Sequence, residues 1–245
     1  MKTWLAKIFN KSTPFTQRAP RIRTNSLNNI AIRISDSESF EVETISSTGL
    51  GLKSATVSTN ESEKRASGVQ PVLNGTLKIN NEEFPIELQV VRSEGVHLGA
   101  RFVTPSPQFL KALNRHFETE LAGLKLVEVN PEYLKSNPDG EPHWFQGGNR
   151  CELSYLLMGG RVNSFAIQVF GNYLEGGDGR ALRASLIAPG AESLSESADK
   201  IRNKGAEILQ PVREVDPSVI ELATRMISAI PALPAATRAE ILGYL

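Results

Sequence analysis

Two short stretches of the sequence hold the residues best suited to bind an anion. Residues 17–23 read QRAPRIR and include Arg18, Arg21 and Arg23. A guanidinium presents a planar fork of N–H donors that matches the oxygens of phosphate. Residues 44–49 read TISSTG, whose hydroxyls and glycine provide short donors and a backbone that a ligand can approach closely. Taken alone, this second stretch is more often an ordinary turn.

Charge is distributed unevenly along a chain whose formal net charge is zero. The first 35 residues carry seven basic side chains and no acidic one, which leaves 20 basic against 27 acidic residues in the rest. Such a basic segment concentrates anions such as phosphate, nucleic acid or an anionic membrane surface. A solvated leader that favours solubility is the plainer alternative.

Residues 1–14 form a basic N-terminal arm. Trp4, Leu5, Ile8 and Phe9, with lysines between them, would give two amphipathic turns suited to a membrane surface or a partner groove. So short a helix is marginal in isolation, and packing onto the chain's own domain is the alternative. We expect peripheral contact of residues 1–11 with a membrane or a partner if the arm acts outside its own fold.

A period of two in hydrophobicity runs from about residue 28 to residue 103 and indicates β-strands. Strands are expected around 30–34, 40–42, 77–79, 84–90 and 96–102, with turns at Asn80-Asn81 and at Ser93-Glu94-Gly95. Short strands joined by tight turns are typical of a small antiparallel barrel or sandwich. Residues 54–71 are polar and are predicted to form an exposed loop.

The period changes to that of a helix at residues 106–123, with Ser106 as N-cap, Pro107 at the first helical position and Gly123 as the predicted stop. Residues 130–142 contain three prolines and predict a linker. Beyond it, strands are expected at 151–158, 162–173 and 180–188, with helices at about 195–204, 217–229 and 234–244. His143-Trp144-Phe145 is interpreted as core at the entry of a strand, with an exposed binding edge as the alternative.

These patterns predict a mainly β chain with two domains. The first, at 15–128, is a small antiparallel β-barrel with a following helix. The second, at 140–245, is an α+β domain of meander strands and terminal helices with no assigned role.

The combination of QRAPR, TISSTG, HLGARF at residues 97–102 and the helix from 106 resembles the PilZ family over about residues 15–125. PilZ domains are small bacterial barrels that bind cyclic di-GMP. Their pattern is Arg-x-x-x-Arg before the first strand and, some twenty residues on, Asp or Asn, any residue, Ser, two more and Gly. Arg21 matches the second arginine, and Ser46 and Gly49 match the later motif. Gln17 stands where the first arginine is expected, with Arg18 one position late, and Thr44 replaces the acid or amide.

The resemblance implies a non-enzymatic cyclic di-GMP receptor of bacterial second-messenger signalling, with motility, biofilm or exopolysaccharide control as usual outputs. The ligand-binding residues that it implies are Gln17, Arg18, Arg21, Arg23, Thr44, Ser46 and Gly49. Signalling would follow from ordering of the arginine-bearing N-terminal segment when ligand binds. The alternative is a degenerate PilZ adaptor that no longer binds the dinucleotide and acts through protein contacts.

Other chemistry finds little support in the sequence. His97, His116 and His143 are scattered, and with a single cysteine they make no metal-ligand spacing. An enzyme in the second half would draw on Cys151, Glu152 or Asp178, but no spacing ties these residues together. We therefore expect no cofactor, no metal and no nucleic-acid partner.

The cysteine count and the length of the apolar runs indicate where the chain is located. One cysteine excludes an internal disulfide, and no apolar run reaches the roughly 18 residues of a spanning helix. The first residues lack the apolar stretch of a signal peptide, so a cytoplasmic location is expected. Cyclic di-GMP and an unidentified protein are the expected partners, and homodimer formation stays open.

The departures from the family pattern generate the first prediction. Gln17→Arg together with Thr44→Asn should tighten cyclic di-GMP binding on the order of tenfold, because one charge-assisted hydrogen bond contributes roughly 1.5 to 3 kcal/mol. Calorimetric titration of both chains measures the change. An unchanged affinity would contradict the alignment of QRAPR with the arginine motif.

Overall fold

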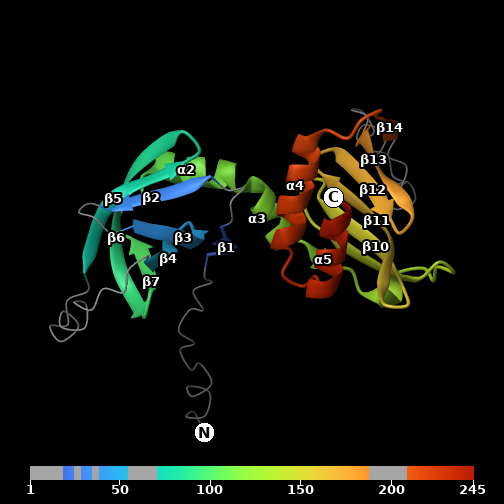
Figure 1. Ribbon diagram of the computed structural model, residues 1–245, viewed down its shortest axis with the longest axis horizontal. Coiled ribbons are helices and arrows are strands. Elements are labelled where there is room, and N and C mark those ends of the chain that lie inside the picture. Colours follow the sequence, from blue (N-terminus) through green and yellow to red (C-terminus); the bar gives the residue numbers. More distant parts are fainter. Residues whose placement is uncertain (1–18, 25–28, 35–38, 55–70, 188–208) are drawn as a thin grey trace, which may run out of the picture. The chain divides into compact units, whose positions relative to one another are not determined.

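The computed structural model describes residues 19–24, 29–34, 39–54, 71–187 and 209–245. The chain divides into two compact units, residues 1–105 and residues 106–245 (Figure 1). No helix in the described ranges is both long and apolar enough to cross a membrane.

The first unit is a closed antiparallel β-barrel. Its strands are β1 (Ile22–Arg23), β2 (Ile30–Ile34), β3 (Ser39–Ser46), β4 (Gly49–Ser54), β5 (Val72–Ile79), β6 (Glu82–Glu94) and β7 (His97–Phe102). They follow the order β1-β3-β2-β5-β6-β7-β4, and β3 also pairs with β4. That additional pairing closes six strands into a barrel, with β1 attached outside the ring to β3. The predicted mainly β fold with a small antiparallel barrel is thereby confirmed.

Alternation along the barrel strands separates an apolar interior from a polar exterior. Leu50 and Leu52 on β4, and Leu98 and Ala100 on β7, are buried. The positions between them, including Gly51 and Gly99, belong to the other face because successive side chains of a strand point to opposite sides. The expected turn at Asn80-Asn81 joins β5 to β6, with Asn80 in the left-handed region at φ 54°. The predicted loop at 54–71 lies mostly outside the described residues.

The second unit combines a meander sheet with helices. Its elements are α2 (Pro107–His116), α3 (Glu118–Leu124), β8 (Val127–Glu128), the 3₁₀ helix η4 (Pro131–Tyr133), β9 (Glu141–Gln146), β10 (Glu152–Met158), β11 (Arg161–Val169), β12 (Asn172–Gly177), β13 (Arg180–Ile187), β14 (Leu209–Pro211), α4 (Pro217–Ala229) and α5 (Ala235–Tyr244). The sheet follows the order β14-β13-β12-β11-β10-β9-β8, so each strand pairs with its neighbour in sequence.

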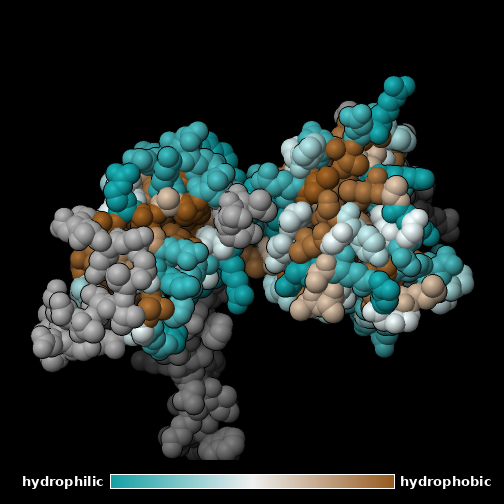
Figure 2. Space-filling view, viewed as in Figure 1, coloured by the Kyte–Doolittle hydropathy of each residue, from teal (hydrophilic) through white to brown (hydrophobic). Residues whose placement is uncertain are grey.

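Helices α4 and α5 lie on one face of this sheet (Figure 1). Their buried residues Met226, Ile227 and Ile241 share one core with strand residues such as Phe145 and Ile167. Figure 2 shows further hydrophobic surface in the region of α4. The predicted terminal helices are confirmed within a residue of their expected bounds.

The helix expected at 106–123 is divided in two. Its start is as predicted, because the Ser106 hydroxyl accepts a hydrogen bond from the Phe109 N–H at 3.2 Å and Pro107 follows. At Phe117 the backbone leaves helical geometry (φ −100°, ψ 17°), and α3 then continues to Leu124. Gly123 is therefore not the stop. A Cβ there would lie 2.3 Å from the Met226 carbonyl oxygen, so glycine allows α3 to approach α4 closely.

The boundary between the units also differs from the expected division. The barrel domain was expected to extend to residue 128, but the compact first unit ends at Pro105. Leu126 belongs to the second core, and β8 pairs with β9. Residues 130–142, expected as a linker, include η4 and the start of β9. Proline spacing predicted the irregular backbone but not its place within the second unit.

Two further predictions in the second unit have different outcomes. The strand expected at 162–173 is interrupted, because Phe170 (φ 48°) and Gly171 (φ 87°) form a turn between β11 and β12. An aromatic residue at a left-handed position gives no turn signal in sequence. The helix expected at 195–204 lies outside the described residues.

A buried ion pair joins the helices of the second unit. The Arg225 guanidinium on α4 donates two hydrogen bonds to the Glu120 carboxylate on α3, at 2.8 and 2.9 Å. It also donates to the carbonyl of His116, the last residue of α2, at 2.6 Å. The side chains of Arg225 and Glu120 are only 11% and 6% exposed. Arg225 therefore provides hydrogen-bond donors both to a buried carboxylate and to the C-terminal carbonyl of α2.

Removing one member of this pair should be strongly destabilising. Arg225→Leu removes the guanidinium from the buried Glu120 carboxylate, and we expect a loss of about 3 to 5 kcal/mol in the free energy of unfolding. Urea denaturation followed by circular dichroism measures it. The double variant Glu120→Leu/Arg225→Leu should recover part of the loss, since it removes the unpaired charge. Equal stability of the single variant and the parent chain would contradict the role assigned to the pair.

Candidate functional site

The arginine segment meets the TISSTG stretch through the pairing of β1 with β3. Ile22 lies opposite Ile45, and Arg23 lies opposite Thr44. The Thr24 N–H donates to the carbonyl of Glu43 at 3.0 Å, and the Thr24 hydroxyl donates to the carbonyl of Val42. The end of β1 is therefore held against the middle of β3.

One row of paired residues defines the interior side of this part of the barrel. It runs through Ile22, Ile45, Leu50, Ala100 and Val90, on β1, β3, β4, β7 and β6. All five are buried, at 6% exposure or less. Because neighbouring positions on each strand point the other way, the rows on either side of it face outward.

The first outward row carries an arginine at each end and glycines near its middle. It runs through Arg23, Thr44, Gly51, Gly99 and Arg92. The two glycines are directly paired across β4 and β7. Between Thr44 and Arg92 the row therefore has two positions without side chains of their own, which we call its floor. We call this row, together with its floor, the glycine row.

The second outward row runs through Ser46, Gly49, Arg101 and Gln89. The Arg101 guanidinium donates to the side-chain carbonyl of Gln89 at 2.5 Å. Ser46 is 4% exposed, and its hydroxyl accepts a hydrogen bond from the Thr48 N–H at 3.3 Å and lies 3.2 Å from the Gly49 carbonyl oxygen. In the free chain, Ser46 therefore stabilises the turn between β3 and β4.

The glycines of the two rows are not equivalent. A Cβ at Gly49 would lie 2.2 Å from the carbonyl oxygen of Ala100, and one at Gly51 would lie 2.4 Å from Oγ1 of Thr44. At Gly99 the nearest atom would be Cβ of Arg92, at an ordinary 3.4 Å. Gly49 and Gly51 are thus required by close packing, whereas a Cβ at Gly99 would make only ordinary van der Waals contacts with Arg92 and Val91.

Two β-bulges flank the glycine row. The register shifts between Val42 and Thr44 on β3, and between Val90 and Arg92 on β6. A bulge adds one unpaired residue and turns the following side chains relative to the ladder. The two bulges therefore set the directions of Thr44 and Arg92, the residues on either side of the glycine floor.

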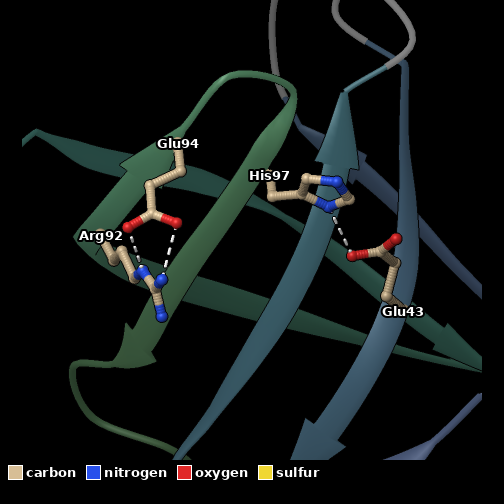
Figure 3. Close-up of polar contacts among 4 residues, drawn as sticks. All are labelled: Glu43, Arg92, Glu94 and His97. Carbon is tan, nitrogen blue, oxygen red and sulfur yellow. Dashed lines mark hydrogen bonds and ion pairs between the residues drawn. The ribbon is translucent and has the colours of Figure 1, made fainter.

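Two ion pairs border the floor (Figure 3). On β6, Arg92 donates to both carboxylate oxygens of Glu94, at 2.8 and 2.6 Å. The hydrogen bonds and the negative charge of Glu94 raise the pKa of Arg92 above its ordinary value. From β7, Nδ1 of His97 reaches Oε2 of Glu43 on β3 at 2.9 Å, across the intervening β4. Both carboxylates near the floor are therefore paired with a basic side chain.

The expected site residues fall into three groups. Arg23, Thr44, Ser46 and Gly49 are brought together by the two outward rows. Arg21 is exposed and directly precedes β1. Gln17 and Arg18 lie outside the described residues.

Sequence reasoning missed Arg92 and Arg101, which share these rows although they lie far along the chain. Their side chains are exposed. The signal available was the alternation of HLGARF, which sends Arg101 outward beside Ala100. Arg92 could not be found this way, because the bulge after Val90 changes the phase of the alternation.

The other expected residues have roles in the fold. His143 stacks on Tyr155 with ring centroids 4.7 Å apart, and His116 contacts Phe117 edge to face. Cys151 is fully buried, and burial raises the pKa of its thiol, so that it stays protonated at neutral pH. In the described part of the chain, no group of three or more His, Cys, Asp or Glu side chains is arranged to hold a metal ion.

Comparison with known proteins gives no family assignment. No protein-family model matches the chain, and no curated protein matches it. Among solved structures, it is similar to the crystal structure of the Legionella uncharacterized protein Lpg0364, with 18% sequence identity and a TM-score of 0.29. The match covers 40% of this chain and 89% of that chain.

The glycine geometry generates a prediction on stability. Gly49→Ala should lower the free energy of unfolding by about 1 to 3 kcal/mol, because its methyl group meets the backbone of β7. Gly99→Ala should change it by less than about 0.5 kcal/mol, since the methyl group makes only ordinary van der Waals contacts there. Urea denaturation of both variants measures the difference. Equal losses at the two positions would contradict this difference in packing.

Proposed function

We propose that the outer face of the barrel binds cyclic di-GMP and that the chain is a non-enzymatic receptor of the PilZ type. The proposed site comprises Arg21, Arg23 and Thr44 on one side of the glycine floor, Arg92 on the other, and Arg101 in the neighbouring outward row. Gln17 and Arg18 complete it from residues that are not described.

The observation that carries the proposal is the register of β1 on β3. Arg23 and Thr44 belong to the two stretches whose chemistry suits an anion, and they lie opposite each other on neighbouring strands. A chain that used TISSTG only as a turn would need no arginine beside it. The likeness to the solved structure carries no part of this argument.

The arrangement suits a ligand with two flat bases and two phosphates. A purine can approach the backbone at Gly51 and Gly99, which carry no side chains of their own, with the side chains of Thr44 and Arg92 beside it. Arginines at both ends of the row can reach phosphate or the O6/N7 acceptors of guanine. The carboxylate of Glu94 is hydrogen-bonded to Arg92, and that of Glu43 to His97.

An adaptor that has lost the ligand is the second candidate. Gln17 lacks the charge of arginine, and Thr44 has one hydroxyl where asparagine has both a donor and an acceptor. In addition, the Ser46 hydroxyl is engaged in its own turn. These three features favour weak binding of cyclic di-GMP. If the chain does not bind the dinucleotide, the adaptor is the remaining function.

The proposed mechanism is ordering of residues 17–23 over the site when ligand binds. Hydrogen exchange would then slow at residues 21–23 and 44–50 together. The part of this step that involves residues 1–18 lies outside the described residues and stays a prediction.

Calorimetry with cyclic di-GMP tests the function. We expect saturable binding to the full chain and none of cyclic di-AMP, because adenine lacks the O6 acceptor. Arg23→Ala and Arg92→Ala should each weaken binding on the order of tenfold, the worth of one charge-assisted contact.

The matched control is Arg33→Ala on β2, which removes the same exposed charge from a strand outside both rows. It should leave the affinity unchanged. If Arg33→Ala weakened binding as much as Arg23→Ala and Arg92→Ala, the interaction would be a general attraction of an anion to basic side chains and not a specific site. Absence of binding up to roughly millimolar ligand, which corresponds to a binding free energy of about −4 kcal/mol, would contradict the receptor hypothesis and favour the adaptor.

A further inference from the structure

The sheet of the second unit has one face that α4 and α5 do not cover. Phe145, Leu153 and Ile167 point toward the helical core. The alternate positions of the same strands point away from it. A cavity of about 820 Å³ lies in this unit, lined by residues of β9 to β13 and by Leu134, Lys135 and Asn137 of the preceding segment. This volume is within the range of ligand-binding clefts.

The floor of this trough is one row of cross-strand neighbours. It runs through Trp144, Ser154, Ala166, Glu175 and Arg183, on five consecutive strands. Ser154 and Ala166, in the middle of the row, have small side chains and leave room for the cavity. Trp144 stands at one end of the row and Arg183 at the other.

Trp144 is fixed in place at its end of the row. Its indole N–H donates to Oε2 of Glu152 at 3.2 Å, and the residue is only half-buried. An aromatic ring held in this way and left partly exposed offers a preformed apolar contact, since no side-chain entropy is lost when another group packs on it.

The lining carries an excess of positive charge. Lys135, Arg180 and Arg183 are exposed, against the single carboxylate of Glu175. Among the described residues, none of the three basic side chains takes part in an ion pair. The trough therefore favours an occupant with negative charge near β13.

The length of the row decides what kind of occupant fits. Four interstrand steps separate Trp144 from Arg183, roughly 19 Å at about 4.8 Å per step. An extended peptide of about six residues spans that distance, at about 3.3 Å per residue. A single nucleotide is too short to reach both ends. Phosphates along a nucleic-acid strand would meet the Glu175 carboxylate, against which a peptide can place an N–H or a hydroxyl.

We propose that this trough binds an extended acidic peptide segment of a partner protein. An apolar side chain packs on Trp144, and acidic side chains about four to six residues away pair with Arg180 and Arg183. This surface belongs to the second unit alone and does not depend on cyclic di-GMP binding.

Selection from random peptides displayed on phage tests the proposal with the full chain as bait. We expect enrichment of peptides with an aromatic or aliphatic residue followed at that spacing by Asp or Glu. Arg183→Glu should replace the acidic preference with Lys or Arg, because the charge at that end is reversed. Lys125→Glu, an equal reversal at an exposed position outside the lining, should leave the selected sequences unchanged. Circular dichroism verifies that the variants fold, and Arg180→Glu is the second choice for reversal.

The chain has two tryptophans, so the Trp4→Phe variant keeps Trp144 alone. Titration of this variant with a synthetic enriched peptide should change the fluorescence of Trp144. The proposal would be overturned if the enriched peptides lacked acidic residues or if no peptides were enriched. It would also be overturned if the Arg183→Glu variant selected the same peptides as the parent chain. Binding that leaves Trp144 fluorescence unchanged would also overturn it. Tighter binding of oligothymidylate than of any selected peptide would make the trough a nucleic-acid site instead.

Discussion

The pairing of β3 is the constraint on which the barrel and its outer face depend. The start of β3 pairs with β2, its end pairs with β1, and its whole length pairs with β4. Closing the ring at β3 and β4 removes both free edges of the sheet, which would otherwise invite pairing with other chains. Closure also fixes register, because a slip by one residue would turn Ile45 and Leu50 out of the core. The alignment of Arg23 with Thr44 is therefore maintained by burial of the interior row together with the hydrogen bonds from Thr24 to β3.

The glycine row runs against the usual preferences of strands. Glycine in a strand interior contributes no side-chain packing and loses conformational entropy on folding. At Gly49 and Gly51, close contacts with β7 and with Thr44 account for the absence of a side chain. At Gly99 a Cβ would meet Arg92 and Val91 only at ordinary van der Waals distances, so close packing does not require glycine there.

Local patterns in the sequence predicted the barrel strands, the start of α2 and the terminal helices, since alternation and capping act over a few residues. The Ser106 cap and the Asp216 carboxylate, which accepts from the Ser218 N–H at 2.8 Å, are of this kind. The break at Phe117 and the turn at Phe170 escaped detection, because tertiary burial set them against local preference. Half of the candidate site was visible as two stretches with suitable chemistry. Arg92 and the row through Trp144 were not, because only the register of strands shows which distant residues share a row.

The structure separates charges that are available to a ligand from charges that are committed to the fold. Arg225 is buried with Glu120, and breaking that pair would leave a charge without solvent, so neither group can serve a ligand. The Arg92–Glu94 pair is 70% and 63% exposed, and exposed pairs contribute little to stability. A phosphate can therefore draw Arg92 from Glu94 at small cost. Within the described part of the chain, Arg180 and Arg183 are exposed and take part in no ion pair. Each proposed surface therefore offers exposed basic side chains, and that of Arg92 must first leave Glu94.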